Sequence, residues 1–245
     1  MIDGTRSSHD GLVTIKGVIR GYQCSRRRAS FVLTTADRSA MGMIAIAAGA
    51  AGLSGPAIST AANATDAEEE ADYLEFELNG QSIKGWVWRS PFKEGDEVEV
   101  AAQWSGRHYE VAGIVRPTDR TIALYPHCSR GRTRHIRNAM KWWVLGCTSF
   151  NLSMLALLFV ISSSAPSRRV ELVEPYLYMA LAVYAFFGLM TMSLARKWMP
   201  FVNVAERVFK ALGLLHPGRV DLVKSSKALR TDQDPGEFGT FYFRY

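Results

Sequence analysis

Acidic residues are missing from a long stretch of this chain, because no Asp or Glu occurs between Asp119 and Glu171. Cysteine is also scarce: the 245 residues hold Cys24, Cys128 and Cys147, with no C-x-x-C pair among them. Nothing in that usage points to an oxidising compartment. The first ten residues contain no apolar run, so we expect no cleavable signal peptide and an N-terminal part that stays in the cytosol.

Charged residues are absent from two runs of twenty, 142–161 and 175–194, although 21% of the chain is charged and its mean hydropathy is −0.02. About twenty apolar residues cross the hydrocarbon core of a bilayer. We therefore predict an integral membrane protein with a transmembrane α-helical hairpin. Neither run contains Asp, Glu, Lys, Arg or His, which argues against a proton relay or an ion-coupled transporter. Four polar residues of the first run are expected at helix contacts: Thr148, Ser149, Asn151 and Ser153.

Lysine and arginine gather on both flanks of these runs and are sparse in the loop between them, Ser162–Glu174. By the positive-inside rule we predict a multi-pass membrane protein with both termini cytoplasmic. The net charge of +6 then reflects contact with anionic lipid head groups, and no nucleic-acid partner is expected. The predicted membrane-interface residues are Arg130, Arg132, Arg134, Arg137, Lys141, Trp142, Trp143, Arg196, Lys197 and Trp198.

Short strands punctuated by turns are predicted over the first half of the chain. Leu74, Phe76 and Leu78 alternate with polar neighbours, and Asn79-Gly80 directly afterwards is a strong hairpin signal. The stretch Ser25-Arg26-Arg27-Arg28 suits a hairpin loop. Seven such strands predict a small antiparallel β-barrel or sandwich, SH3-like or OB-like. The predicted strands are 12–22, 29–35, 73–78, 82–88, 97–104, 109–115 and 121–125.

Residues 39–65 interrupt this pattern with an uncharged segment that is mostly Ala and Gly. One interpretation is a weakly ordered loop or a short helix packed on the barrel. The other is a third, marginal membrane-inserting segment, in which Ala47, Ala51 and Gly55 would form a small-residue row for helix contact. Both interpretations stay open at the level of the sequence.

Three regions are predicted: a cytoplasmic β domain (1–128), a basic flank with the two-helix hairpin (129–199), and a C-terminal region (200–245). Within the last region, 201–215 has an amphipathic helical pattern and is expected to lie on the membrane or on the barrel. The aromatic end of the chain predicts a final strand that packs back on the β domain.

No catalytic motif is present, whether a phosphate-binding loop, an H-E-x-x-H helix or a nucleophile elbow. The five histidines are scattered, so we expect no metal, no cofactor and no enzyme. Trp86, Trp88 and Trp104 could stack on a base or sugar, but packing or membrane docking is the favoured interpretation.

Several segments together resemble bacterial membrane proteins described as type VI secretion system effectors. These segments are 85–100, 116–120, 123–132, Lys141-Trp142-Trp143, and the Asp-Pro-Gly-Glu tail that ends in Tyr-Phe-Arg-Tyr. The resemblance implies a bacterial inner-membrane or membrane-targeting role and assigns no catalytic residue.

Three functions are weighed on this basis: a membrane-inserting effector, a resident inner-membrane immunity or adaptor protein that binds a protein partner, and a membrane-bound hydrolase, which has the least support. The expected partners are the bilayer with its anionic head groups, and a type VI secretion component or a cognate toxin or immunity protein. A homo-oligomer is also considered.

Overall fold

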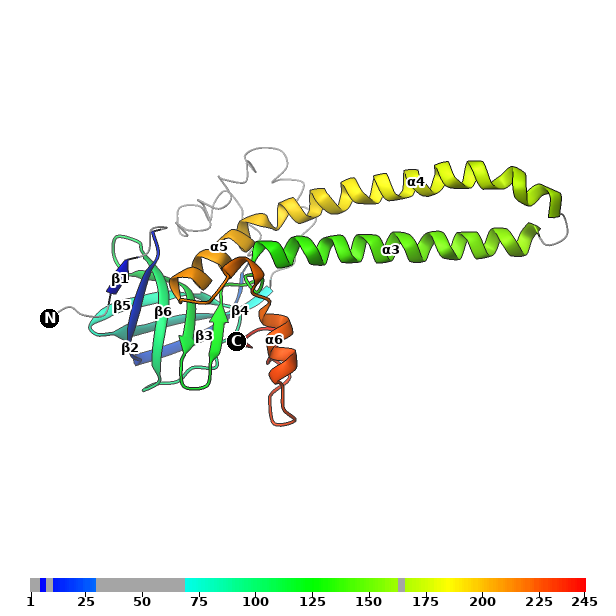
Figure 1. The fold of residues 1–245 in the computed structure, drawn as a ribbon. Coiled ribbons are helices and arrows are strands. Elements are labelled where there is room, and N and C mark those ends of the chain that lie inside the picture. Colours follow the sequence, from blue (N-terminus) through cyan, green and yellow to red (C-terminus); the bar gives the residue numbers. More distant parts are fainter. Residues whose placement is uncertain (1–4, 8–10, 30–68, 163–165) are drawn as a thin grey trace. The chain divides into compact units, whose positions relative to one another are not determined.

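The computed structural model describes residues 5–7, 11–29, 69–162 and 166–245 (Figure 1). The chain divides into two compact units. We call them the sheet unit, which comprises the described parts of 1–134 together with 199–245, and the hairpin unit, 135–198. The protein is α+β, as predicted, and its sheet unit is built from chain segments on both sides of the hairpin.

Nine strands form one sheet in the described part of the chain. The strand order is β1-β2-β6-β7-β5-β4-β3, with β8 paired to β7 and β9 paired to β8. The two end strands β1 and β3 do not pair with each other within the described residues, so this sheet is open. The SH3-like or OB-like classification stays a prediction. The strands are β1 (Thr5–Ser7), β2 (Val13–Val18), β3 (Arg20–Ala29), β4 (Glu69–Leu78), β5 (Gln81–Val87), β6 (Glu97–Trp104), β7 (Tyr109–Arg116), β8 (Thr121–Leu124) and β9 (Phe243–Arg244).

The hairpin of β4 and β5 confirms the Asn79-Gly80 signal, because both turn residues have positive φ, 53° and 78°. The alternation along β4 is also confirmed. Leu74, Phe76 and Leu78 are buried in the core of the sheet unit, while their neighbours are partly or fully exposed. The two-residue period therefore identified the core face of this strand correctly.

One ladder differs from the antiparallel arrangement that we expected. Strands β5 and β7 run parallel, with Ile83 opposite Tyr109 and Lys84 opposite Glu110, so the sheet is mixed. Gly85 permits the close approach: its φ is 153°, and a Cβ there would lie 2.8 Å from the Val111 amide nitrogen. Parallel pairing between distant segments leaves no turn signal in the sequence.

The hairpin loop predicted at Ser25–Arg28 is wrong. These residues lie inside β3, which pairs with β4 in antiparallel register. Opposite charges across the two strands stabilise that pairing, since Arg26 Nε lies 3.0 Å from Asp72 Oδ1 and Arg28 Nε lies 3.4 Å from Glu70 Oε1. The strand predicted over 29–35 and the segment 39–65 fall almost wholly outside the described residues.

Four α-helices and a short 3₁₀ helix, η3 (Pro217–Arg219), are described. The α-helices are α3 (Arg132–Ile161), α4 (Pro166–Lys197), α5 (Met199–Ala211) and α6 (Leu222–Leu229). Helix α5 packs on the sheet, which confirms one of the two placements expected for it: Thr14 Oγ1 donates to Ala211 O at 2.8 Å, and Val208 lies against Gly113 of β7. The helix ends earlier than predicted, because Gly213 has a positive φ of 74° and Leu215 is left 86% exposed.

The C-terminal tail returns to the sheet as predicted. Strand β9 pairs antiparallel with β8, placing Phe243 opposite Ile122. Hydrogen bonds hold it to α6: Ser225 Oγ donates to Arg244 O at 2.7 Å, and the Arg244 amide donates to Ser226 Oγ at 2.8 Å. Phe238 and Phe243 are fully buried, so the tail contributes to the core of the sheet unit.

Candidate functional site

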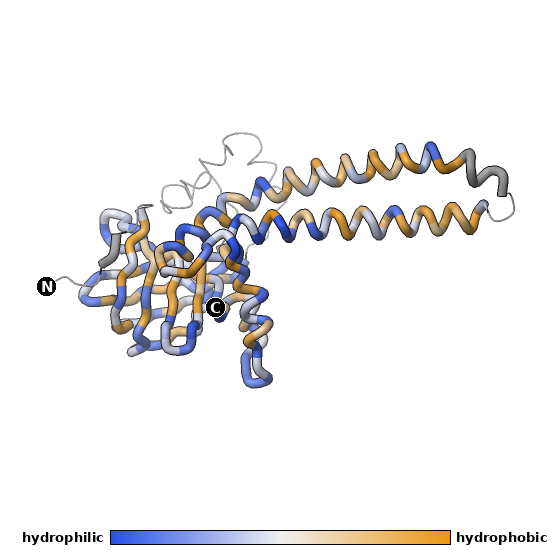
Figure 2. The backbone as a smooth tube through the Cα atoms, viewed as in Figure 1, coloured by the Kyte–Doolittle hydropathy of each residue, from blue (hydrophilic) through white to orange (hydrophobic). Residues whose placement is uncertain are grey.

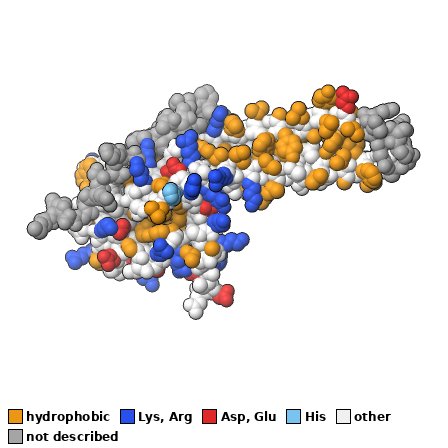
Figure 3. Space-filling view, viewed as in Figure 1, with side chains coloured by type: hydrophobic (Ala, Val, Ile, Leu, Met, Phe, Trp, Pro, Cys, Tyr) orange, Lys and Arg blue, Asp and Glu red, His pale blue; other side chains and the backbone are white. Residues whose placement is uncertain are grey.

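Hydrophobic residues recur along α3 and α4 (Figure 2), and in the space-filling view their side chains cover much of the visible face of the hairpin (Figure 3). Both helices are long and apolar enough to cross a membrane. In the most apolar stretch of each helix, 11% of the residues of α3 and none of those of α4 are buried. Leu181 and Leu189 of α4, for example, are 68% and 72% exposed. A core helix of a soluble protein would bury this surface, so the candidate functional site is the hairpin itself.

The charge-free runs correspond in length to a bilayer core. Each run of twenty residues spans about 30 Å as an α-helix, which equals the usual thickness of the hydrocarbon core. Charged residues occur only toward the ends of the two helices. In α3 they are Arg132, Arg134, Arg137 and Lys141, and in α4 they are Arg168, Arg169, Glu171, Glu174, Arg196 and Lys197.

Polar groups join the two helices in the middle of the hairpin. The Trp143 indole donates to Tyr184 O at 3.2 Å, and the Thr148 and Tyr184 hydroxyls lie 2.7 Å apart. The Tyr176 hydroxyl donates to Asn151 O at 2.7 Å. These bonds confirm the expected helix contact for Thr148, and they place Trp143 inside the hairpin as well as near its basic end.

Two other polar side chains of α3 bond to their own helix. Asn151 Nδ2 donates to Cys147 O at 2.8 Å, and Ser153 Oγ donates to Ser149 O at 2.9 Å. These two side-chain hydrogen bonds stay within α3, because a carbonyl one turn earlier is the nearest acceptor for a short polar group in a helix. Asn151 is buried and its backbone oxygen receives the Tyr176 hydroxyl, as expected for helix contact, whereas the Ser153 side chain is exposed. Oδ1 of Asn151 is buried without a hydrogen-bond partner.

Asp221 engages two of the arginines that the sequence assigned to the membrane interface. Its carboxylate lies 3.3 Å from Arg130 Nε and 2.6 Å from Arg134 Nε, and it also caps α6 by accepting from the Lys224 amide. Burial opposes ionisation of this carboxyl, but the hydrogen bonds from Arg134 and Lys224 outweigh it, so the pKa of Asp221 is lowered.

The start of α3 is held within the sheet unit by a second acid, Glu206. Its Oε1 accepts from the Arg132 amide at 2.7 Å, at the positive end of the helix dipole.

Lipid contact stays a prediction for all the basic residues of the flank. Of these, Arg137, Lys141, Arg196 and Lys197 are exposed and belong to the hairpin unit.

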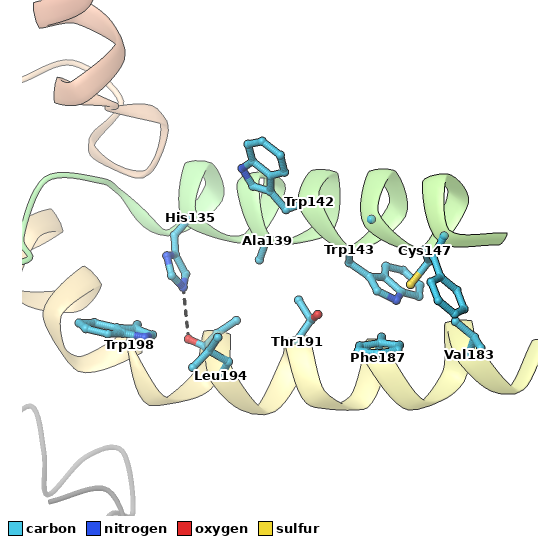
Figure 4. Close-up of a pocket in the computed structure, with 13 residues that line it drawn as sticks. His135, Ala139, Trp142, Trp143, Cys147, Val183, Phe187, Thr191, Leu194 and Trp198 are labelled. Atoms are coloured by element: carbon cyan, nitrogen blue, oxygen red, sulfur yellow. Dashed lines mark hydrogen bonds between the residues drawn. The ribbon is translucent and has the colours of Figure 1, made fainter. Parts of the chain in front are cut away.

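A groove of about 510 Å³ runs along one side of the hairpin (Figure 4). His135, Trp198 and Ala195 lie at its basic end, where the His135 Nε2 is 3.2 Å from Ala195 O. Phe150 and Val183 lie at its other end. The lining is mostly apolar, with His135 and Thr191 as polar members, and His135 lies only at the basic end, so the two ends differ chemically.

Three of the segments that were compared with type VI effectors, 85–100, 116–120 and the tail, contact one another in the sheet unit. Arg89, from the first segment, has Nε 3.3 Å from Glu237 Oε1 of the tail. Arg116 binds both Asp96 and Asp119 at 2.7 Å. Arg116 and Asp119 are only three positions apart, but Arg89 and Glu237 are 148 apart, so no local pattern could have indicated that second contact.

The tryptophans considered as stacking platforms have aromatic neighbours within the protein. Trp88 is half-buried, with its ring centroid 4.9 Å from that of His127 and 5.3 Å from that of Phe241, which favours packing. Trp86 contacts Tyr73 edge to face at 5.0 Å. Trp104 remains 55% exposed.

His127 and Cys128 form the link between the sheet and α3. His127 has a positive φ of 67°, and its Nε2 lies 3.0 Å from Glu69 Oε2. Burial lowers the pKa of His127, although the Glu69 carboxylate opposes this effect. Burial raises the pKa of the Cys128 thiol, which donates to Phe201 O at 3.4 Å. The neutral forms of both side chains are therefore favoured here.

Comparison of the chain with protein-family models, curated proteins and solved structures gives no match. Among the described residues, no group of three or more His, Cys, Asp or Glu side chains could hold a metal ion. The helix-contact residues predicted at Ala47, Ala51 and Gly55 lie outside the described part of the chain.

Proposed function

We propose that this protein is a non-enzymatic integral membrane protein, in which the α3–α4 hairpin crosses the bilayer and the sheet unit stays at one surface. The observation that carries the proposal is that the described residues before 135 and those from 199 to 245 belong to one compact unit. A hairpin whose two ends leave the same folded unit returns the chain to the side from which it departed. The exposed apolar surface of both helices supports the same proposal.

The charge distribution favours the cytoplasmic side for the sheet unit. Four cations lie at the end of the hairpin unit near the sheet connections, namely Arg137, Lys141, Arg196 and Lys197. The positive-inside rule places such a cluster in the cytoplasm. The proposal is therefore a multi-pass protein with both termini cytoplasmic, and the resemblance to type VI effectors adds the bacterial inner membrane to it.

Alkaline carbonate extraction of membranes from expressing cells tests the anchor. The full chain should remain in the membrane pellet, because two apolar helices hold it there. Leu181→Lys combined with Leu189→Lys should reduce the pelleted fraction strongly, since each charge near the middle of a span costs about 3 kcal/mol. Leu229→Lys in α6 is the control and should leave the protein in the pellet. Full release of the unmodified chain into the supernatant would sink the proposal.

For the biological role we propose a membrane-inserting effector of type VI secretion. Support comes from the resemblance of several segments, and from the ion pairs that hold some of these segments together in the sheet unit. If this role is right, expression in a sensitive cell should depolarise its membrane, as measured with a potential-sensitive dye. The Leu181→Lys, Leu189→Lys variant should be harmless at equal expression.

A resident immunity or adaptor protein is the second candidate. It is favoured by a partly exposed face of the sheet, on which the Arg27 guanidinium lies 5.3 Å from the Tyr73 ring and Trp86 contacts Tyr73 from the side. Aromatic residues and arginine are enriched at protein–protein interfaces. A harmless wild-type chain that captures a toxin or a secretion component through this face, and loses it on Trp86→Ala, would replace the effector role.

A further inference from the structure

We propose that the groove along the hairpin holds one acyl chain of an anionic phospholipid, whose head group lies at the level of Arg137, Lys141, Arg196 and Lys197. This inference rests on the proposed function, because it requires the hairpin to lie in a bilayer. It goes beyond the general contact of the basic flank with anionic head groups, because it assigns a specific binding site to one lipid.

The groove has the size and the lining of a ligand site. Its volume of about 510 Å³ lies within the range of about 300–1,000 Å³ that is typical of small-molecule pockets. Gly146 leaves the wall open, since a Cβ at this position would meet nothing within 4 Å. Phe150, Val183 and Phe187 supply apolar walls farther along (Figure 4).

The length of the groove matches one leaflet. Its lining residues on α3 extend from His135 to Phe150, a rise of about 22 Å at 1.5 Å per residue. Half of a bilayer, with its head-group layer, is about 20–22 Å thick. A chain in the groove would therefore reach from the head-group level to near the bilayer centre.

One end of the groove lies among basic and interfacial residues and the other end is apolar, which matches the charged head group and the apolar acyl chain of a phospholipid. Trp142, which is 65% exposed, lines the basic end, and the Lys141 ammonium lies 6.0 Å from its ring. Tryptophan and lysine at this level are typical of the membrane–water interface. No acidic residue lies between His135 and Val170, so no carboxylate of that segment competes with a phosphate.

Charge also indicates that the groove holds a lipid rather than a second copy of the chain. Two copies joined through this groove in a symmetric contact would bring their Lys141 and Lys197 side chains to the same level, where like charges repel. An anionic head group relieves that repulsion. Each lysine near the membrane surface contributes about 1 kcal/mol, or about fivefold, to binding of an anionic lipid.

Quenching of tryptophan fluorescence by brominated lipids tests the site with the full chain in nanodiscs. Phosphatidylglycerol with brominated acyl chains, at a tenth of the lipid, should quench several-fold more than brominated phosphatidylcholine at the same fraction. Gly146→Phe fills the groove and should remove this preference. Ala182→Phe adds the same bulk to an exposed position of α4 outside the groove lining and should preserve it.

A second pair of substitutions leaves the groove open. Lys141→Gln with Lys197→Gln should remove most of the preference for phosphatidylglycerol, because each lysine contributes about fivefold to binding. Equal quenching by the two lipids in the wild type would overturn the lipid site alone. A chain that never enters nanodiscs would overturn both this site and the proposed function. Native mass spectra showing two chains without lipid would assign the groove to a second copy.

Discussion

Arg89 and Glu237 are 148 positions apart in the chain, yet their side chains form an ion pair with Nε 3.3 Å from Oε1. The same guanidinium donates to Glu70 O at 2.6 Å and to Trp88 O at 3.0 Å. It also lies 5.0 Å from the centre of the Phe241 ring, and its side chain is 9% exposed. One buried arginine thus joins the tail to β4 and to the residues after β5.

Substitution of Arg89 should destabilise the sheet unit more than substitution of its acidic partner. Arg89→Met should cost about 3 kcal/mol, because it leaves two carbonyls and a carboxylate without this donor. Glu237→Gln should cost about 1 kcal/mol, since that side chain is 45% exposed. Urea unfolding of the detergent-solubilised chain measures both. Asp232→Asn, at an exposed position of the same tail, is the control, and equal losses for all three would contradict the role of Arg89.

Asp221 should make stability depend on acid pH. Its folded-state pKa lies below the ordinary value of about 3.9, so its contribution is fully present above about pH 4 and is lost as pH falls through the folded pKa. Asp221→Asn keeps a capping side chain for α6 but removes the charge that binds Arg130 and Arg134. We expect a loss of about 1–3 kcal/mol at pH 7 that shrinks below pH 4. Unfolding midpoints measured across this range test it, and a pH-independent difference would contradict it.

His127 should also make the free energy of unfolding fall as the pH drops, but in a higher pH range than Asp221 does. Its folded-state pKa is lowered, so the unfolded chain binds the proton first, and stability falls as pH drops below about 6.5 toward the folded pKa. His127→Asn removes the titrating group while tolerating the positive φ. The variant should therefore lose less stability than the wild type between pH 8 and 5.5. Thermal unfolding at these pH values is the measurement, and identical slopes would refute the assignment.

Gly85 should not tolerate a side chain. Gly85→Ala should cost about 1–3 kcal/mol, because the new methyl group would press on the Val111 amide and because the backbone φ of 153° disfavours other residues. Gly236→Ala is a matched control, since a Cβ there meets nothing within 4 Å. Circular dichroism during thermal unfolding should separate the two. An unaffected Gly85→Ala protein would contradict the close parallel pairing of β5 with β7.

The features that the sequence could predict depend on neighbouring residues. The strand alternation at Leu74–Leu78, the turn at Asn79-Gly80 and the charge-free runs each lie within one short window. The hairpin loop at Ser25–Arg28 failed because the partners of these arginines, Asp72 and Glu70, lie more than forty positions away. A run of three arginines suggests a loop when it is read alone, but acidic residues on the neighbouring strand make it compatible with a β-strand.

The same limit applies to the candidate site. Composition alone identified the two apolar helices, because membrane-crossing length is a property of consecutive residues. Composition could not show that Arg130 and Arg134 bind Asp221, which follows the hairpin in the chain. It also could not show the groove, which needs the side chains of both helices in place.

The central claim is that the hairpin crosses a membrane while both of its ends stay on the cytoplasmic side. Alkaline phosphatase fused near Pro166 or after Tyr245 measures this most directly, with a fluorescent protein active only in the cytoplasm fused at the same points. We predict phosphatase activity only for the fusion near Pro166, and fluorescence only for the fusion after Tyr245. High phosphatase activity at Tyr245, or none at Pro166, would contradict the account.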